Sequence, residues 1–284
     1  TGSTRAGVQA LDGALAEGPW SPVDGGEDHN HGARVGLVVA SDCPRGAPDS
    51  ETEHAAGAGA AAVVLAADGP GEVLATGDYV EPYPGTRFRE AGAESTETLG
   101  VTGYEREAFT MALGGAVDAM GPMDGMDAVD ATEAPLDDTV DAAAVQSPDG
   151  KLPYRATDAL GVDADQIAAA ETVSDLGDTG AASALLGAAR AIEDGAERVL
   201  LAGYGSGAGA TVVLLDAGDG VPVETALEGD ESLSYSAYLR RRGEITSGEP
   251  EGGGAYVSVP TWQRTHPQRH RLVAGRCADC EALQ

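Results

Sequence analysis

The sequence is poor in basic, aromatic and sulfur-containing residues. Only 17 of its 284 residues are Lys or Arg, a single lysine (Lys151) among them, against 47 Asp and Glu, and aromatic residues make up 4%. The formal net charge of -30 argues against a nucleic-acid partner, because the phosphate backbone is also negative. Three cysteines do not form a disulfide framework. No apolar stretch reaches the roughly 18 residues of a membrane span, and no signal peptide is visible. The expected compartment is a reducing cytoplasm, with no membrane partner.

The acidic, lysine-poor and alanine-rich composition resembles that of cytoplasmic proteins of extreme halophiles. In such proteins carboxylates keep the surface hydrated in concentrated salt, where a Debye length of ~3 Å screens most of the self-repulsion. A charged chain can also be disordered, but hydrophobic residues make up 42% of this one and stand in separate blocks. We therefore expect a folded chain, long enough for one large domain or two modest ones.

A glycine-rich run, VLLAGYGSGAGATVVLLDAG at 199–218, has two possible interpretations. A phosphate-binding loop leads from a strand into a helix and usually has a Lys and a Ser or Thr after the glycines. No lysine follows Gly209, and residues 211–215 are β-branched or aliphatic, which favours a second strand. We predict a strand, a glycine turn and a strand, in which glycine lets the backbone turn or lets a substrate approach.

The same pattern occurs twice in the chain. Residues 32–42 and 54–69 predict two strands joined by a glycine-rich segment, as do residues 195–220, and each copy follows an Ala-rich helical stretch, at 1–18 and at 178–195. Small residues on both helices predict close packing in the middle of a layered α/β structure. The alternative is two ordinary α/β units that are alike through composition bias.

This order resembles the thiolase superfamily and, within it, archaeal 3-hydroxy-3-methylglutaryl-CoA synthases. Three segments carry the resemblance. Residues 36–66 read as a strand ending in Ala-Ser-Asp with a Gly-Ala-rich strand after it, and residues 136–167 as a strand ending in a His-Gln-Pro-Asn-Gly-Lys type motif with a helix after it. Residues 174–210 read as a Gly-Asn-Thr type helix with a Tyr-Gly-Ser-Gly-Ala turn. The resemblance implies an α/β fold with αβαβα layers and an internal duplication over residues 1–245.

The family joins acetyl-CoA to acetoacetyl-CoA and needs no cofactor besides the coenzyme A thioester. A cysteine takes the acetyl group, a glutamate acts as acid and base, and a histidine orients the second substrate. The cysteine reacts as a thiolate, which a helix N-terminus favours, and the thioester oxygen needs hydrogen-bond donors as charge develops. The repeat pairs Thr1 with Thr179, so we expect the cysteine one residue before Thr1 and the glutamate further upstream, outside the sequence. The resemblance also implies a homodimer.

Two positions of the family pattern carry other residues here. The histidine position is Gln146, which can donate a hydrogen bond but cannot change charge near neutral pH. The asparagine position is Asp178, an acceptor where a donor is expected. β-Ketoacyl synthase III, a further candidate, expects His and Asn at the same two positions. His54 is a possible substitute for the histidine, although a surface position is the simpler interpretation. Cys43, after the Ala-Ser-Asp strand end, is a possible nucleophile, although a small buried cysteine is the simpler interpretation.

Ser206 lies between Gly205 and Gly207 in the turn that the resemblance places beside the acyl-CoA pocket. We take Ser206 as a candidate catalytic residue and the two glycines as candidate CoA contacts. Lys151 stands where the family motif has a lysine; it either contacts a CoA phosphate as a point charge or simply lies at the surface.

The composition changes after residue 220. Residues 234–245 predict a last helix and 246–255 a linker, and residues 256–284 are locally basic. This last segment resembles the start of the zinc-ribbon and OB-fold proteins that accompany archaeal thiolases and synthases. Cys277 and Cys280 have the spacing of half a structural zinc site, whose usual set is four thiolates. Two free thiols are the alternative.

Two functions of different classes follow from these observations. The first is an acyl-CoA-condensing enzyme of the synthase type, which the order of the motifs favours. The second is a non-catalytic paralogue that binds acyl-CoA or acts as a scaffold for an acetoacetyl-CoA thiolase through its C-terminal segment. The residues at positions 146 and 178 favour the second function.

Overall fold

The computed structural model describes residues 3–17, 35–66, 69–100, 102–122, 136–207, 209–218, 220–229, 231–246, 258–266, 269, 271 and 274–283. The chain divides into two compact units, residues 1–230 and residues 231–284. The first unit holds the strands and most of the helices. The second holds two short helices and two of the three cysteines.

The strands of the described residues form one five-stranded sheet and two strand pairs. The large sheet has the order β6-β3-β9-β8-β7, in which β7 and β8 are parallel and the other neighbours are antiparallel. Because β9 is antiparallel to both β3 and β8, strands β3, β7 and β8 point the same way. The bounds are β1 Val35–Asp42, β2 Gly59–Ala66, β3 Glu72–Val80, β4 Arg87–Phe88, β5 Glu97–Thr98, β6 Gly121–Pro122, β7 Ala142–Val145, β8 Arg198–Gly205 and β9 Gly209–Asp216.

The helices alternate with these strands along the chain. The α-helices are α1 Ala6–Glu17, α2 Glu51–Ala55, α3 Thr102–Asp118, α5 Thr157–Leu160, α6 Ala164–Ala169, α7 Val173–Leu176, α8 Ser183–Glu193, α9 Tyr235–Arg241 and α10 Val259–Thr265, and the 3-10 turns are η1 Leu136–Asp138, η2 Pro153–Arg155 and η3 Gly180–Ala182. The turn η3 runs directly into α8, so the two form one continuous element.

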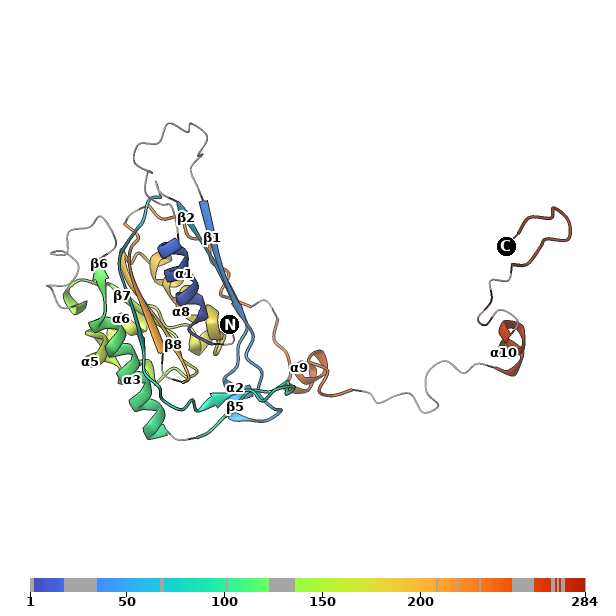
Figure 1. The fold of residues 1–284 in the computed structure, drawn as a ribbon, viewed down its shortest axis with the longest axis horizontal. Coiled ribbons are helices and arrows are strands. Elements are labelled where there is room, and N and C mark those ends of the chain that lie inside the picture. Colours follow the sequence, from blue (N-terminus) through green and yellow to red (C-terminus); the bar gives the residue numbers. More distant parts are fainter. Residues whose placement is uncertain are drawn as a thin grey trace, which may run out of the picture. The chain divides into compact units, whose positions relative to one another are not determined.

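Helices α1 and α8 lie between the β1–β2 pair and the large sheet (Figure 1). Around them a buried apolar cluster includes Val8 and Leu185. Helices α3 and α6 pack on the opposite face of the large sheet, where a second cluster includes Phe109 and Leu113. The described layers therefore run β, α, β, α, which are four of the five layers predicted from the sequence.

Glycine permits the close contact between the two central helices. A Cβ atom added to Gly7 in α1 would overlap the backbone carbonyl oxygen of Ala181 in η3. Helix α8 has a similar position at Gly187, where a Cβ atom would lie 2.5 Å from the carbonyl oxygen of Ala170. The predicted close packing of the two central helices is confirmed at Gly7, whereas Gly187 packs closely against the residue that follows α6.

The predicted repeat is present as two units of a helix followed by an antiparallel strand pair. In the first unit α1 precedes β1 and β2, and in the second α8 precedes β8 and β9. The glycine run at 199–218 is indeed strand, turn, strand. One detail differs: the second strand of the first unit begins at Gly59 rather than at His54, because Ser50 caps α2 by accepting the N–H of Glu53. Thr1, which the repeat pairs with Thr179, lies outside the described residues.

The β1–β2 pair is apolar on both faces. Val38 and Ala40 point toward the central helices and are buried, whereas Val35, Leu37 and Val39 alternate with them and are 65%, 65% and 59% exposed. Buried strands of α/β folds are covered on both sides and show such continuous apolar sequences. The exposed face of this pair therefore has the composition of a covered one.

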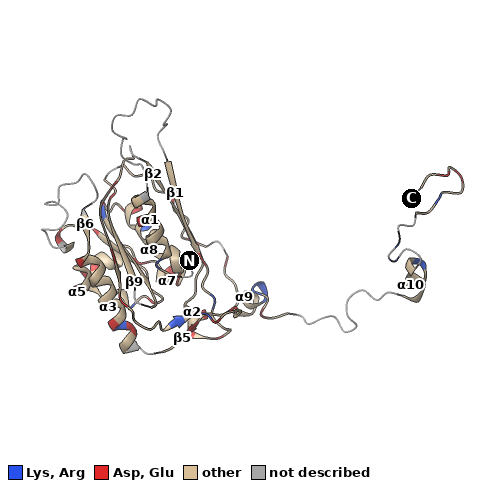
Figure 2. Cartoon of the chain, in the orientation of Figure 1, with Lys and Arg blue, Asp and Glu red and all other residues tan. Residues whose placement is uncertain are grey.

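The acidic residues do not gather in one place, and the two helices of the second unit have serine caps. Acidic residues are spread over several helices and loops (Figure 2), as the composition predicts. In the second unit α9 and α10 each begin after a serine, Ser234 and Ser258, whose hydroxyl accepts a backbone N–H of the first turn. Within the described part of the chain, no helix has the length and apolarity needed to cross a bilayer.

Candidate functional site

Three parallel strands end at the same edge of the large sheet. β7 is followed by Gln146, β8 by Ser206, and β3 by the loop that contains Arg87. In open α/β sheets ligands bind outside the carboxyl ends of the strands. We call this set of loops the carboxyl edge, and it contains most of the site residues predicted from the sequence.

The turn between β8 and β9 contains Ser206 and Gly207 and is flanked by Gly205 and Gly209. Gly205 pairs with Gly209, and Gly207 has a φ of 103°, a conformation that favours glycine. The hydroxyl oxygen of Ser206 accepts the backbone N–H of Thr86 at 2.9 Å and of Arg87 at 3.0 Å. In this geometry Ser206 holds the loop after β3 against the turn; its catalytic role stays a prediction.

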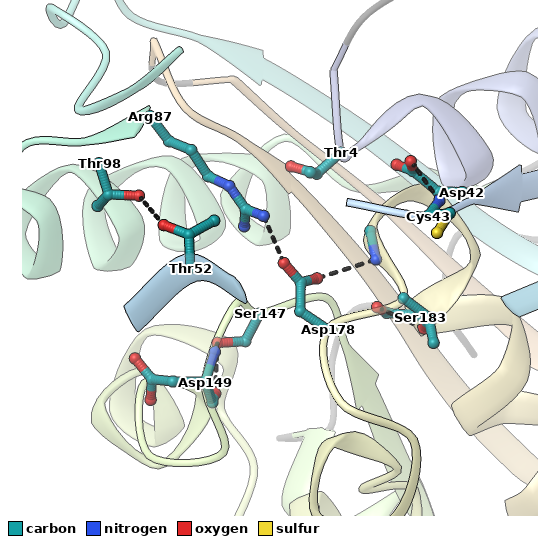
Figure 3. Close-up of polar contacts among 12 residues, drawn as sticks. Thr4, Asp42, Cys43, Thr52, Arg87, Thr98, Ser147, Asp149, Asp178 and Ser183 are labelled. Carbon is teal, nitrogen blue, oxygen red and sulfur yellow. Dashed lines mark hydrogen bonds and ion pairs between the residues drawn. The ribbon is translucent and has the colours of Figure 1, made fainter. Parts of the chain in front are cut away.

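Asp178 forms a buried ion pair with Arg87 (Figure 3). The Nη2 atom of Arg87 lies 2.6 Å from Oδ2 of Asp178, with side chains that are 11% and 2% exposed. The contact is an ion pair, and Oδ2 of Asp178 accepts no hydrogen bond among the described residues. The other carboxylate oxygen of Asp178 accepts the N–H of Gly180 at 2.9 Å. Sequence analysis did not identify Arg87, since the Thr-Arg-Phe-Arg stretch at 86–89 forms no motif of known chemistry.

Gln146 is buried with an unpaired amide. Its residue is 2% exposed, its backbone N–H donates to the carbonyl oxygen of Ala202 at 2.8 Å, and neither Nε2 nor Oε1 has a hydrogen-bond partner among the described residues. An unsatisfied buried polar group costs about 1–3 kcal/mol. The amide of Gln146 is therefore a buried polar group that is left unsatisfied by the described residues.

A Gln146→Met protein is expected to be more stable than the wild type by about 1 kcal/mol or more, because the unpaired amide is replaced by an apolar group of similar shape. The matched control is Gln166→Met. Gln166 is also buried, but its Nε2 donates to the carbonyl oxygen of Val140 at 2.6 Å and its Oε1 accepts the N–H of Asp163 at 2.8 Å. That change should destabilise by about 1–3 kcal/mol. Denaturant unfolding of both proteins checks the opposite signs, and two losses would contradict the description of Gln146.

The loop after Gln146 is fixed by its own polar groups. Ser147 is buried and its hydroxyl donates to the carbonyl oxygen of Asp149 at 2.6 Å. Oδ1 of Asp149 accepts the N–H groups of Lys151 and Leu152 at 2.7 and 2.8 Å. The Lys151 side chain is exposed, so both interpretations made from the sequence stay open.

The N-terminus of η3–α8 is capped by two acidic residues, Asp178 just before it and Asp42 at the end of β1. Asp42, at the end of β1, accepts the N–H of Ala181 at 3.1 Å through Oδ2 and the N–H of Cys43 at 2.8 Å through Oδ1. Cys43 is exposed. His54 is 57% exposed and pairs with the exposed Asp49, so it lies at the surface as the simpler interpretation predicts.

Glu105 in the first turn of α3 faces the same loops. The pKa of Glu105 is raised, mainly by burial and further by the negative charge of Asp149. The hydroxyl of Thr86, which donates to Oε1 of Glu105 at 3.4 Å, and the positive charge of Arg87 lower this pKa and offset part of the rise. Burial also raises the pKa of Tyr204 to about 12, with a further rise from the charge of Glu105. The carboxyl edge thus favours neutral forms of both groups.

A Glu105→Gln protein is expected to become more stable relative to the wild type as the pH rises. The raised pKa means that the neutral form contributes stability below the unfolded-state pKa of about 4.5, and that this contribution is lost as the pH rises through the folded-state pKa. The difference from the wild type should therefore be small at the acid end and grow toward neutral pH. Glu107→Gln, an exposed change on the same helix, is the control in urea unfolding from pH 4.5 to 8. A difference that is constant with pH would contradict this assignment.

The C-terminal cysteines occupy a tight turn in the second unit. The N–H of Cys277 donates to the carbonyl oxygen of Ala282, and the N–H of Glu281 donates to the carbonyl oxygen of Cys277. Backbone N–H groups of Cys280 and Asp279 lower the pKa of the Cys277 thiol. Among the residues described in the structure, no group of three or more His, Cys, Asp or Glu side chains could hold a metal ion.

The sequence-predicted site residues are therefore only partly assembled. The carboxyl edge brings together Gln146, Ser206 and the loop of Lys151, and Asp178 joins them through the unpredicted Arg87. The predicted metal residues lie in the other unit. The unpaired state of Gln146 has no signature in the sequence.

Comparison with known proteins gives hydroxymethylglutaryl-CoA synthases among the sequence relatives. The chain is 27% identical to the hydroxymethylglutaryl-CoA synthase of Caldivirga maquilingensis over 220 residues, which cover 74% of this chain and 60% of that protein. It is 30% identical to that of Methanopyrus kandleri over 231 residues, which cover 76% of this chain and 58% of the relative. The chain thus spans about three fifths of the curated relatives that it matches. No protein-family model matches the sequence.

Solved structures show the same architecture at lower identity. A structure of MvaS in complex with 3-hydroxy-3-methylglutaryl coenzyme A matches with a TM-score of 0.58 at 18% identity, covering 77% of this chain and 58% of that one. The 3-oxoacyl-(acyl carrier protein) synthase III of Pseudomonas aeruginosa also matches with a TM-score of 0.58, at 17% identity, covering 78% of this chain and 67% of that one. The chain is therefore a homologue of archaeal hydroxymethylglutaryl-CoA synthases with a thiolase-like α/β fold.

Proposed function

We propose that this protein takes part in the condensation of acyl-CoA thioesters, in the manner of a hydroxymethylglutaryl-CoA synthase that joins acetyl-CoA to acetoacetyl-CoA. The observation that carries the proposal is the carboxyl edge: the buried, unpaired Gln146, the Ser206 turn and the Arg87–Asp178 pair belong to neighbouring loops. Sequence homology to synthases over about three quarters of the chain supports it.

Gln146 has a defined role in this proposal. Its Nε2 donates a hydrogen bond to the carbonyl oxygen of a bound thioester and so supports the charge that develops there. Because an amide does not change charge near neutral pH, Gln146 itself neither takes nor gives a proton. The half-buried carboxyl of Glu105, whose pKa is raised by burial, and the exposed Cys43 lie on neighbouring elements.

A binding or scaffolding protein is the second candidate. The observation that favours it is the same Gln146, together with Asp178 at the asparagine position of the family pattern. In this case the carboxyl edge binds acyl-CoA without turning it over, and the C-terminal segment recruits an acetoacetyl-CoA thiolase. A homodimer, implied by the resemblance, is common to both candidates.

Covalent labelling separates the two candidates. The whole gene product that contains residues 1–284 is incubated with radiolabelled acetyl-CoA in concentrated KCl, followed by intact mass measurement and peptide mapping. Acetylation of a cysteine supports the enzyme, and a Cys43→Ser protein shows whether the exposed thiol at the end of β1 carries the label. Binding of CoA without any label supports the binding protein, and neither binding nor label would overturn both.

Two further parts of the proposal concern the solvent and the second unit. The charge of -30 is an adaptation to concentrated salt. The melting temperature should therefore keep rising with KCl concentration above about 1 M, where a Debye length of ~3 Å already screens most of the repulsion between surface charges.

Cys277 and Cys280 supply one half of a structural zinc site, since two thiolates are half of the usual set of four. The other ligands of this site lie outside the described residues. Zinc content that is unchanged by Cys277→Ser would contradict the zinc assignment.

A further inference from the structure

We propose that Arg87 is a positioning residue that couples the Ser206 turn (Gly205, Ser206 and Gly207) to Asp178 and so fixes the shape of the acyl-CoA site. The inference rests on the proposed function for the ligand, whereas the coupling itself rests on contacts within the chain. A single residue makes both contacts, one through its backbone and one through its side chain.

The backbone contact joins two loops of the carboxyl edge. The Ser206 hydroxyl oxygen accepts N–H groups from both Thr86 and Arg87, residues that stand 120 and 119 positions away in the chain. The loops also approach closely here, since a Cβ atom on Gly85 would lie 3.1 Å from the backbone nitrogen of Gly207. These contacts tie the Ser206 turn and the loop after β3 to each other.

The side-chain contact joins that loop to the N-terminus of η3–α8. Asp178 receives the guanidinium on Oδ2 and the N–H of Gly180 on Oδ1. Its backbone is held as well, because its N–H donates to the carbonyl oxygen of Ala55 at 2.7 Å and its carbonyl oxygen accepts the N–H of Gly57 at 2.9 Å. Asp178 is thus a fixed anchor, and the planar guanidinium transfers its position to the loop.

Coupling through a shared member makes the effects of two separate changes non-additive. Ser206 and Asp178 make no hydrogen bond or ion pair with each other in the described contacts, and Arg87 contacts both. Asp178→Asn removes the charge that holds the guanidinium but keeps an oxygen for the N–H of Gly180. Ser206→Ala removes the acceptor of the backbone N–H groups and leaves the Arg87 side chain in place.

Hydrogen exchange tests the coupling without any ligand. In the Asp178→Asn protein, the amides of Thr86 and Arg87 should exchange at least about threefold faster than in the wild type, because loss of the ion pair lets the loop open. Asp175→Asn is the matched control, since Asp175 lies in the same segment but forms an exposed pair with Arg190. Unchanged exchange at residues 85–88 in Asp178→Asn would overturn the positioning role.

Acetyl-CoA binding tests the consequence for the site. Ser206→Ala and Asp178→Asn should each raise the dissociation constant, and the double variant should differ from the product of the two effects by about threefold or more. Arg87→Lys keeps the charge but loses the fork, so it should weaken binding and leave the stability closer to the wild type than a neutral residue does. Purely additive effects would overturn the proposal. A wild-type protein that does not bind acetyl-CoA would overturn the proposed function instead, and the exchange measurement would still decide on the coupling.

Discussion

An Arg87→Met protein is expected to lose about 3–5 kcal/mol of its free energy of unfolding. The change leaves the Asp178 carboxylate, 2% exposed, without its opposite charge, and a buried ion without a partner is far more costly than the pair is favourable. The loss is large against the roughly 5–15 kcal/mol that stabilise a whole domain. Urea unfolding followed by circular dichroism measures it directly.

Arg198→Met provides the matched control for this result. Arg198 is the first residue of β8 and so lies at the end of the strand away from the carboxyl edge. It pairs with Asp216 at 3.1 Å, but the two side chains are 45% and 31% exposed. Such exposed pairs contribute at most about 1 kcal/mol. A double variant, Arg87→Met with Asp178→Asn, removes both buried charges and should recover part of the loss. If Arg87→Met were as mild as Arg198→Met, the buried pair would not be a main support of the carboxyl edge.

A Gly7→Ala protein is expected to be destabilised by about 2–3 kcal/mol, even though alanine is the better helix former. The added methyl group would overlap the backbone carbonyl oxygen of Ala181, and a backbone atom cannot move aside as a flexible side chain can. Overpacking of this kind costs typically 1–3 kcal/mol, and α1 would have to shift away from η3. Thermal and denaturant unfolding both report the change.

Gly13→Ala in the same helix should have the opposite sign. No atom lies within 4 Å of a Cβ added at Gly13, so only the helix propensity changes, which favours alanine by about 0.8–1 kcal/mol. The pair of variants separates packing from propensity within one helix. Equal effects of the two changes would show that the contact between α1 and η3 does not determine the result at position 7.

The central layers of the fold could be predicted from the sequence because their pattern is local. Apolar spacing in the two helices and runs of β-branched residues in the strands identify the repeated units, and glycine marks the places where backbones meet, such as Gly7 and Gly187. The helix α2 was not predicted, since its start depends on the Ser50 cap rather than on an apolar period.

The candidate site was less predictable because its interactions are between distant segments. The positions of Gln146, Asp178 and Ser206 follow from the resemblance to the synthase family, but their partners do not. The role of Arg87 depends on its contact with Asp178, which forms only when the strands bring distant segments to one edge of the sheet. The unpaired amide of Gln146 depends on how the interior packs around it. Neither is encoded in a short spacing.

The shortage of lysine provides a single chemical handle on the molecule. Lys151 is the only lysine in the sequence; its side chain is exposed while its backbone is held by Asp149. Among the side chains of residues 1–284, an amine-reactive fluorophore would therefore attach only to this one, in the loop that follows Gln146, and labelling of the α-amino group would be counted separately by peptide mapping. The emission of such a dye would report ligand arrival at the carboxyl edge in real time, with all three cysteines left unmodified.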